Sequence, residues 1–313
     1  MKISECEIGK PVEMILKFTK IQYFPQNRQD SQEYASITGL DSDKRTIDVR
    51  IWKVTDEIKK RITENGIYLC KGKIKLFNDK KQFMIDNDGI TEANVNPDDY
   101  LIKCPLEINE LQIEISRYIR KIQNDNLRNI VTKAIMKIQN EYFSYPAAVS
   151  IHHNYLGGIA YHIYSMLTLS EVYLKQYKYF NSDLVYAGII IHDMGKVKEL
   201  SGVDKTTYTA EGNLLGHITI GVNMLHDVCK ELSLENTEEA LALEHIILSH
   251  HGKQEYGSPI IPKIPEAALI FILDYSDSRF ASLSEIMKQV KPGEYTEPVF
   301  AFDKRIFYIP NIK

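Results

Sequence analysis

The sequence predicts a multi-domain protein in which an all-β barrel is followed by an all-α bundle of helices. The length of 313 residues exceeds what one hydrophobic core usually serves. Apolar residues alternate with polar ones in short runs before residue 90, whereas spacings of three and four residues dominate after residue 107. All nine histidines lie after residue 150, so the chemistry of the chain is expected in its second half.

The first domain, residues 1–95, is predicted to contain five short strands and one helix. Strands are expected at 13–21, 33–40 and 45–52, a helix carries Val54, Ile58 and Ile62, and a hairpin joins 67–77 to 81–85 through Asn78-Asp79-Lys80. Three strands, a helix and two strands is the order of an OB-fold barrel.

Helices are predicted for most of the remaining chain. Asn96-Pro97-Asp98-Asp99 marks a boundary, and a helical linker region is expected over 96–145 because one apolar stripe continues from Glu107 to Tyr142. Residues 146–313 form the last domain, in which helical spacing continues until a β-rich tail near 299–309.

Composition narrows the class of protein. No apolar run approaches the ~20 residues that span a bilayer, and the first ten residues lack the apolar core of a signal peptide, so a cytoplasmic location is expected. The scattered Cys6, Cys70, Cys104 and Cys229 argue against a zinc knuckle and a disulfide framework. The net charge of −4 gives no general affinity for nucleic acid, so a polyanion would be held by a local patch or by metal ions.

Histidine and aspartate residues recur at the ends of the predicted helices. The candidates are His162, His192-Asp193, His217, His250-His251 and Asp274. Facing helices of a bundle can each project one or two such ligands inward. His192-Asp193 and Asp274 both follow fully apolar runs, and burying these groups is costly unless a metal ion compensates them. His226 and His245 lack such a context and are interpreted as ordinary structural residues.

These residue types favour a site with two divalent ions. A carboxylate can bridge two metals, and Asp193 is the natural bridge. Two ions would polarise a phosphoryl group and generate hydroxide at neutral pH. Lys196 follows Asp193 by three residues and could contact a phosphate oxygen.

The order of these motifs resembles the HD superfamily of metal-dependent phosphohydrolases, and longer strings resemble the YhaM family. The strings are His152-His153-Asn154-Tyr155-Leu156-Gly157-Gly158, Ile191-His192-Asp193-Met194-Gly195-Lys196, Leu214-Leu215-Gly216-His217-Ile218 and Leu248-Ser249-His250-His251-Gly252. That family consists of bacterial 3'-to-5' exoribonucleases with an N-terminal OB-fold before the HD domain. The resemblance covers almost the whole chain.

The resemblance implies a division of ligands between two ions. One ion would be held by His162, His192, Asp193 and Asp274, and the other by Asp193, His217 and His250. The catalytic residues would be Asp193, Lys196 and His251, the last two facing the phosphate, while His153 would lie near the site without an assigned role. The chain departs from the family at Tyr161, where an acidic residue commonly precedes the first ligand, and at Tyr275-Ser276-Asp277-Ser278-Arg279, which leaves the substrate contacts there unassigned.

The barrel is the predicted nucleic-acid-binding domain, although its first hundred residues balance 17 basic against 17 acidic side chains. Lys71, Lys73 and Lys75 share one face of a predicted strand, which forms either a binding patch or simply a solvated surface. The aromatic residues available for base stacking, with a place in the barrel core as the alternative, are Tyr23, Phe24, Tyr34, Trp52 and Phe77. Of these, Trp52 and Phe77 are the predicted binding residues.

The predicted function is a metal-dependent 3'-to-5' exonuclease of single-stranded RNA, with DNA also open as substrate. Mn²⁺ is the first choice of ion, and Fe²⁺ or Co²⁺ would suit the same ligands. One alternative is a phosphohydrolase of a small or cyclic nucleotide, and another is a non-catalytic protein that binds single strands. Apolar positions along 107–142 also permit a homo-oligomer.

Overall fold

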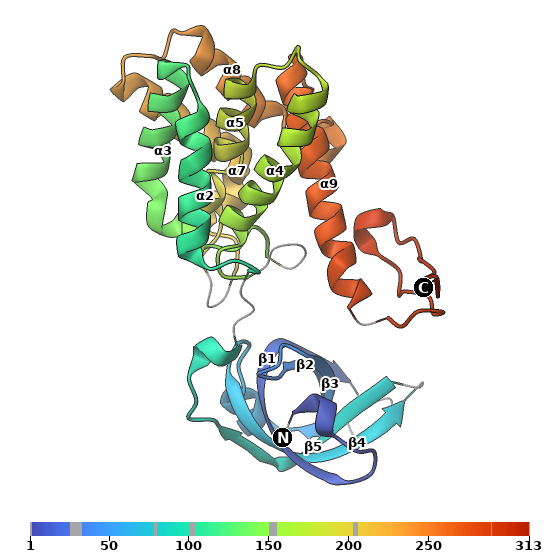
Figure 1. Cartoon of the computed structure of the whole chain (residues 1–313). Coiled ribbons are helices and arrows are strands. Elements are labelled where there is room, and N and C mark those ends of the chain that lie inside the picture. The colour runs from blue at the N-terminus through green and yellow to red at the C-terminus, as the bar shows by residue number, and fades with distance from the viewer. Residues whose placement is uncertain are drawn as a thin grey trace. The chain divides into compact units, whose positions relative to one another are not determined.

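An all-β unit and a helical unit divide the chain, Met1–Ile102 and Lys103–Lys313 (Figure 1). The computed structural model describes residues 2–25, 33–77, 80–100, 104–149, 155–202, 206–288 and 290–312. The predicted succession of a barrel and a helical region is confirmed.

The first unit is a closed five-stranded barrel. Its strands are β1 (Pro11–Pro25), β2 (Glu33–Leu40), β3 (Thr46–Val54), β4 (Ile67–Phe77) and β5 (Lys80–Glu92), with helix α1 (Asp56–Arg61) between β3 and β4. Around the barrel the order is β1-β2-β3-β5-β4, and β4 pairs with β1 to close it. Among the strand pairs of the described residues, only β3–β5 is parallel. This is the strand order of an OB-fold, as predicted.

Strand alternation places the barrel core. On β3 the side chains of Ile47, Val49 and Ile51 are buried, and they pack with Phe18 and Phe83 inside the barrel. The predicted helix began too early, because Val54 still belongs to β3. Thr55 is the N-cap, and its hydroxyl accepts a hydrogen bond from the Ile58 amide. The predicted turn at Asn78-Asp79 lies outside the described residues.

The helical unit packs its long helices around one core. They are α2 (Ile108–Lys121), α3 (Asp125–Ser144), α4 (Gly158–Gln176), α5 (Ser182–Ile191), α7 (Ala210–Glu231), α8 (Glu238–Ser249) and α9 (Pro265–Met287), with a single turn, α6 (Lys196–Glu199), after α5. The predicted linker helices α2 and α3 contribute Leu111 and Ile130 to this same core.

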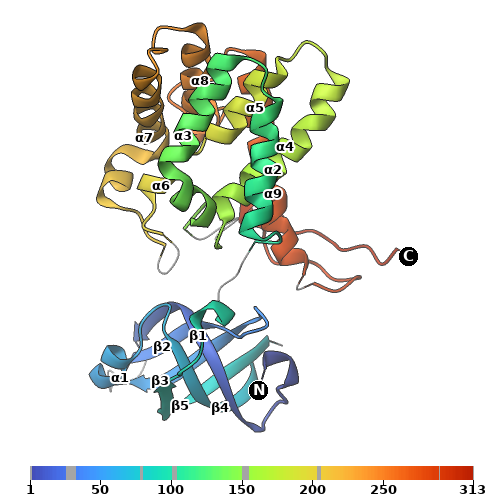
Figure 2. The same ribbon diagram turned by 60° about the vertical axis from the view of Figure 1, so that its left-hand side comes forward.

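Helix α5 lies at the centre of the helical unit, surrounded by α2, α3, α4, α8 and α9 (Figures 1 and 2). Every residue from Val185 to Ile191 is buried, as expected of a helix that is apolar on all sides. Gly188 lets its neighbours approach, since a Cβ there would lie 2.6 Å from Ile270 and 2.8 Å from Ile246. The end of α5 is therefore held firmly inside the bundle.

The single helical stretch predicted for 107–142 is broken in the structure. Helix α2 ends at Lys121, and the Asn124 side chain caps α3 by accepting a hydrogen bond from the Leu127 amide at 2.9 Å. The amides of Gln123 and Asn124 both donate to Asp183 Oδ2, at 2.8 and 2.7 Å. A carboxylate from the start of α5 thus satisfies the backbone at the break.

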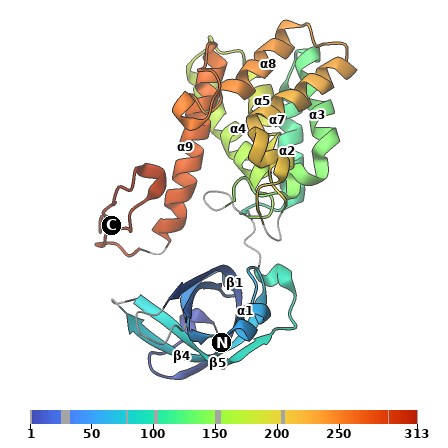
Figure 3. The ribbon, with the colours of Figure 1, turned by 180° about the vertical axis from the view of Figure 1, so that it is seen from behind.

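The chain after α9 contains no named strand among its described residues, contrary to the β-rich tail predicted from the sequence. Isolated bridges join Tyr295 to Tyr308 and Val299 to Arg305. The ribbon of this segment follows α9 to the C-terminus in Figure 3. Across the described part of the chain, none of the helices has the length and apolar character needed to cross a membrane.

Candidate metal centre

Asp193 lies at the centre of the predicted ligand cluster, directly after α5, and is 2% exposed. Its Oδ2 atom is 3.4 Å from His192 Nε2 and 3.8 Å from His162 Nε2. Its Oδ1 atom is 3.7 Å from Nε2 of both His217 and His250. One carboxylate therefore faces a different pair of imidazoles with each oxygen.

Two of these imidazoles belong to C-cap residues and are oriented by the last turns of their helices. His192 caps α5 and His250 caps α8. In each, Nδ1 donates to a carbonyl of the last turn, His192 to Ile189 at 2.8 Å and His250 to Ile247 at 2.7 Å. Helix ends leave such carbonyls without intrahelical partners. The proton is thereby fixed on Nδ1, and the lone pair of Nε2 points at Asp193.

His217 is oriented by a carboxylate that the sequence did not reveal. Glu199 Oε1 lies 3.0 Å from His217 Nδ1 and accepts the His217 backbone N–H at the same distance. Gly216 breaks α7 here with a φ of 70°, which frees that N–H from the helical pattern. Burial would raise the pKa of Glu199, but the hydrogen bond from His217 lowers it, so the carboxylate stays charged.

His162 lies between two carboxylates of α9. Its Nδ1 is 2.7 Å from Asp277 Oδ2, and its Nε2 is 3.3 Å from Asp274 Oδ1. Burial would lower the pKa of His162, but the hydrogen bonds to Asp274 and Asp277 outweigh it and raise that pKa to about 10. The Nε2 proton therefore occupies the side of the ring where a metal ion would bind.

Lys196 contributes a cation to the buried cluster. Its Nζ lies 2.8 Å from Asp193 Oδ2. The sequence predicted that Lys196 contacts a phosphate oxygen, which remains a prediction. Burial would lower the pKa of Lys196, but Asp193 raises it, so the ammonium remains charged. Burial would likewise raise the pKa of Asp193, yet the charge of Lys196 brings it well below its usual range.

Several polar atoms of the cluster are buried without a hydrogen-bond partner among the described residues. They are His192 Nε2, Asp193 Oδ1, His217 Nε2 and His250 Nε2. Leaving such atoms unsatisfied is costly, and a shared cation would satisfy all of them. Ligand pairs 3.3 to 3.8 Å apart also suit atoms that each bind one ion at about 2.1 Å. The residues thus fit divalent metal.

The ligands fall into two groups that each could hold an ion, His162, His192 and Asp193 in one, and His217, His250 and His251 in the other. The second group contains His251, for which the sequence predicted a contact to phosphate. His251 Nδ1 lies 2.9 Å from the Tyr256 carbonyl and donates to it, which leaves a lone pair on Nε2. A lone pair favours a metal ion over a phosphate oxygen.

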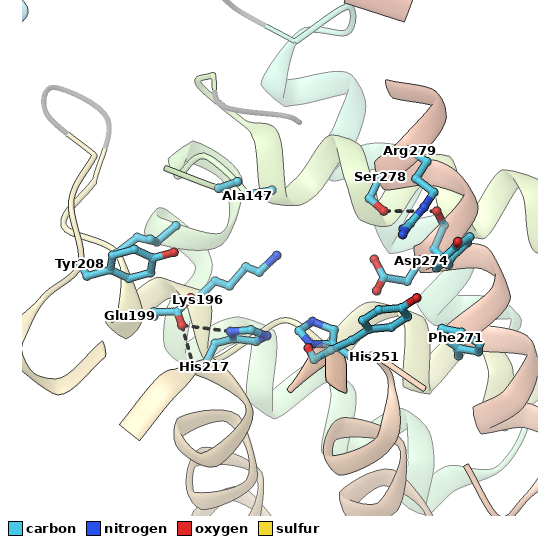
Figure 4. Close-up of a pocket in the computed structure, with 14 residues that line it drawn as sticks. Ala147, Lys196, Glu199, Tyr208, His217, His251, Phe271, Asp274, Ser278 and Arg279 are labelled. Atoms are coloured by element: carbon cyan, nitrogen blue, oxygen red, sulfur yellow. Dashed lines mark hydrogen bonds and ion pairs between the residues drawn. The ribbon is translucent and has the colours of Figure 1, made fainter. Parts of the chain in front are cut away.

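A cavity of about 400 Å³ opens beside the cluster (Figure 4). Lys196, His217, His251 and Asp274 of the cluster line it. Further polar and aromatic residues line the rest, among them Tyr208, Tyr256, Phe271, Tyr275, Ser278 and Arg279. The ligand cluster is therefore accessible to a molecule of about nucleotide size.

Comparison with known families bears on the same helices. Residues 159–279 match the HD domain family. HD domains are usually metal-dependent hydrolases, and the histidine and aspartate groups described above supply ligands of that kind. The match spans α4 to α9, from which all of the clustered ligands come.

Two solved structures are similar to the chain, both at 17% identity and a TM-score of 0.25. One is the second OB-fold domain of replication protein A from Methanococcus maripaludis, with 31% of this chain and 96% of that chain covered. The other is a replication protein A heterotrimer bound to ssDNA, with 36% of this chain and 29% of that chain covered.

The side chains predicted to bind nucleic acid lie on the outside of the barrel. Trp52 on β3 is 47% exposed and Phe77 on β4 is 61% exposed, so neither belongs to the core. Lys71, Lys73 and Lys75 are exposed along β4, and Lys71 forms an ion pair with Glu13 at 3.0 Å.

A row of aromatic rings crosses β1, β2 and β3. Tyr34 lies between Phe24 and Trp52, with ring centroids 5.4 and 5.0 Å apart. Arg50 stands 5.8 Å above the Tyr34 ring. Only Trp52 of this row was selected from the sequence as a binding residue.

Sequence reasoning missed Glu199, Asp277 and Arg279. Asp277 supplies a carboxylate for His162, whose preceding residue in the chain is Tyr161 and not an acidic residue. Its position three residues after Asp274 on a helix was the available signal. No pattern marked Glu199, whose partner lies 18 residues away. His153 lies outside the described residues.

Proposed function

We propose that this protein is a metal-dependent 3'-to-5' exonuclease that hydrolyses phosphodiester bonds of single-stranded RNA, with Mn²⁺ as its preferred ion. The observation that carries the proposal is the convergence of unpartnered, buried Nε2 and Oδ1 atoms around Asp193. Such an arrangement is costly for an apo core and suited to divalent ions.

Asp193 would bridge the ions, with His162, His192 and Asp274 on one side and His217, His250 and His251 on the other. Ions at this position supply Lewis acidity toward a phosphoryl group and lower the pKa of bound water. Lys196 keeps its positive charge beside Asp193, lines the cavity and would contact a phosphate oxygen of the substrate. Glu199 and Asp277 hold the imidazole rings in place.

The barrel would guide the single strand. The rings of Phe24, Tyr34 and Trp52 form a surface on which bases of any sequence can stack, and Arg50 adds a cation beside it. A hydrolase of small nucleotides would have no use for such a row, so the barrel favours a polymeric substrate.

The test uses single-stranded RNA labelled at the 5' end or the 3' end and incubated with Mn²⁺. We expect a ladder of shortened 5'-labelled products and labelled mononucleotide from the 3'-labelled strand. Both should disappear with a chelator and in Asp193→Ala, whereas Asp227→Ala, an exposed aspartate of α7, should behave as wild type.

Other outcomes would favour the alternatives. Intact RNA combined with turnover of a cyclic dinucleotide would assign the site to a small-nucleotide phosphohydrolase. Strand binding without turnover in any divalent metal would identify a non-catalytic binding protein.

A further inference from the structure

Arg279 occupies an unusual position in the wall of the cavity. Its guanidinium carbon lies 3.3 Å from the centre of the Tyr275 ring, one helical turn earlier on α9. Flat stacking at this distance fixes the guanidinium plane and leaves its N–H edges available. Both residues line the cavity beside the ligand cluster, and Figure 4 shows Arg279 in its wall.

The side chain of Arg279 makes no ion pair and no hydrogen bond with any of the described residues. The other side-chain cation of the cavity, Lys196, is already bonded to Asp193. A half-buried arginine that is held by stacking and lacks an acidic partner is prepared for an anion from outside the chain.

The place of Arg279 along α9 suggests which anion. Asp274, on the same helix, reaches the ligand cluster. Arg279 follows Asp274 by five positions, so their Cα atoms are about 7.5 Å apart along the helix axis. Both side chains point into one cavity (Figure 4). A phosphate bound beside Asp274 would therefore share this cavity with Arg279, which would be left to contact a neighbouring phosphate of the same strand.

We propose that Arg279, stacked on Tyr275, binds the phosphate next to the scissile one on its 5' side. This inference rests on the proposed exonuclease function. When the terminal nucleotide leaves with its 5'-phosphate, no further phosphate lies on its 3' side, so a second phosphate can come only from the preceding nucleotide. The site would then recognise two successive phosphates and so prefer oligonucleotides to isolated phosphodiesters.

Diadenylate with and without a 5'-phosphate provides the probe, because the two molecules differ only in the second phosphate. Wild type should cleave the phosphorylated form with a kcat/KM about 10- to 100-fold higher, the usual scale for a bidentate arginine–phosphate contact. In Arg279→Gln this ratio should fall to about one. Arg279→Lys keeps the charge without the planar fork and should give an intermediate ratio.

Arg305→Gln is the matched control, since Arg305 is 70% exposed in the chain beyond α9 and should keep the wild-type ratio. Equal cleavage of both dinucleotides by wild type would overturn the subsite, as would an equal loss on both in Arg279→Gln.

Titration calorimetry separates this inference from the proposed function. It measures the binding of both dinucleotides to wild-type protein in the presence of a chelator, where no cleavage occurs. Tighter binding of the phosphorylated form, lost in Arg279→Gln, supports the subsite even if no cleavage is seen. Equal binding overturns it. Absence of RNA cleavage in Mn²⁺ overturns only the exonuclease.

Discussion

In the helical unit each clustered imidazole has its second nitrogen bonded within the protein, whereas the strand-binding candidates of the barrel stand on its outer surface. His192, His217 and His250 are fixed by a carbonyl or a carboxylate before any ion arrives. Trp52 and Phe77 are about half exposed or more and can adapt to a ligand. The proposed catalytic site is therefore preorganised, whereas the proposed strand-binding surface can adapt to its ligand.

The largest effect is expected from Asp193→Asn. The amide cannot bridge two cations, so bound metal measured by mass spectrometry should fall and kcat on RNA should drop about 10³-fold or more. RNA binding through the barrel should change little. The double variant Asp193→Asn/Lys196→Met restores charge balance in the core, and recovery of activity there would contradict the ligand role of Asp193.

Second in size is Glu199→Gln, which tests whether the ring orientation matters. Loss of the carboxylate that orients His217 should weaken Mn²⁺ binding about 10- to 100-fold, measured by titration calorimetry. Glu244→Gln is the matched control, because Glu244 bonds the exposed His226 in the same way at 3.3 Å. Similar effects of the two substitutions would show that the cluster is not preorganised.

The pH dependence of metal binding follows from His162, whose pKa is raised to about 10. Below that value the free protein holds a proton on His162 that a bound ion must displace. Affinity for Mn²⁺ should therefore rise with pH, about tenfold per unit between pH 7 and 8.5, with release of about one proton. Calorimetry in buffers of different ionisation enthalpy measures this proton, and Asp277→Asn should reduce its release.

The same comparison explains what the sequence could predict. Ligands such as His192 and Asp274 follow apolar runs, so their burial was evident from the chain alone. The carboxylates that orient His217 and His162 were not evident, because Glu199 and Asp277 reach these histidines only through tertiary packing, across 18 and 115 residues.

In the barrel, strand alternation alone could not locate the aromatic row. The register of β1 shifts between Phe18 and Lys20, which reverses its alternation, so Tyr23 packs on the core and Phe24 faces outward. The break between α2 and α3 likewise depends on the distant Asp183.

Trp52→Ala tests the adaptable surface directly. Loss of one stacking ring should weaken binding of single-stranded RNA about tenfold, measured by fluorescence anisotropy with chelated protein. Tyr179→Ala removes a ring that is 70% exposed in the helical unit and should have no effect. If both substitutions weakened binding alike, the aromatic row would lose its assigned role.

The smallest expected effect comes from substituting single lysines of β4, and it should differ between Lys75 and Lys71. Lys75 is exposed and has no ion pair with a described residue, whereas Lys71 is neutralised by Glu13 at 3.0 Å. Lys75→Ala should weaken RNA binding about two- to threefold and reduce the slope of log Kd against log salt by about one. Lys71→Ala should change that slope less, because its cation releases fewer counterions from the strand. Slopes that stay at the wild-type value in both variants would mean that the strand does not contact this face of the barrel, and the aromatic row alone would then account for binding.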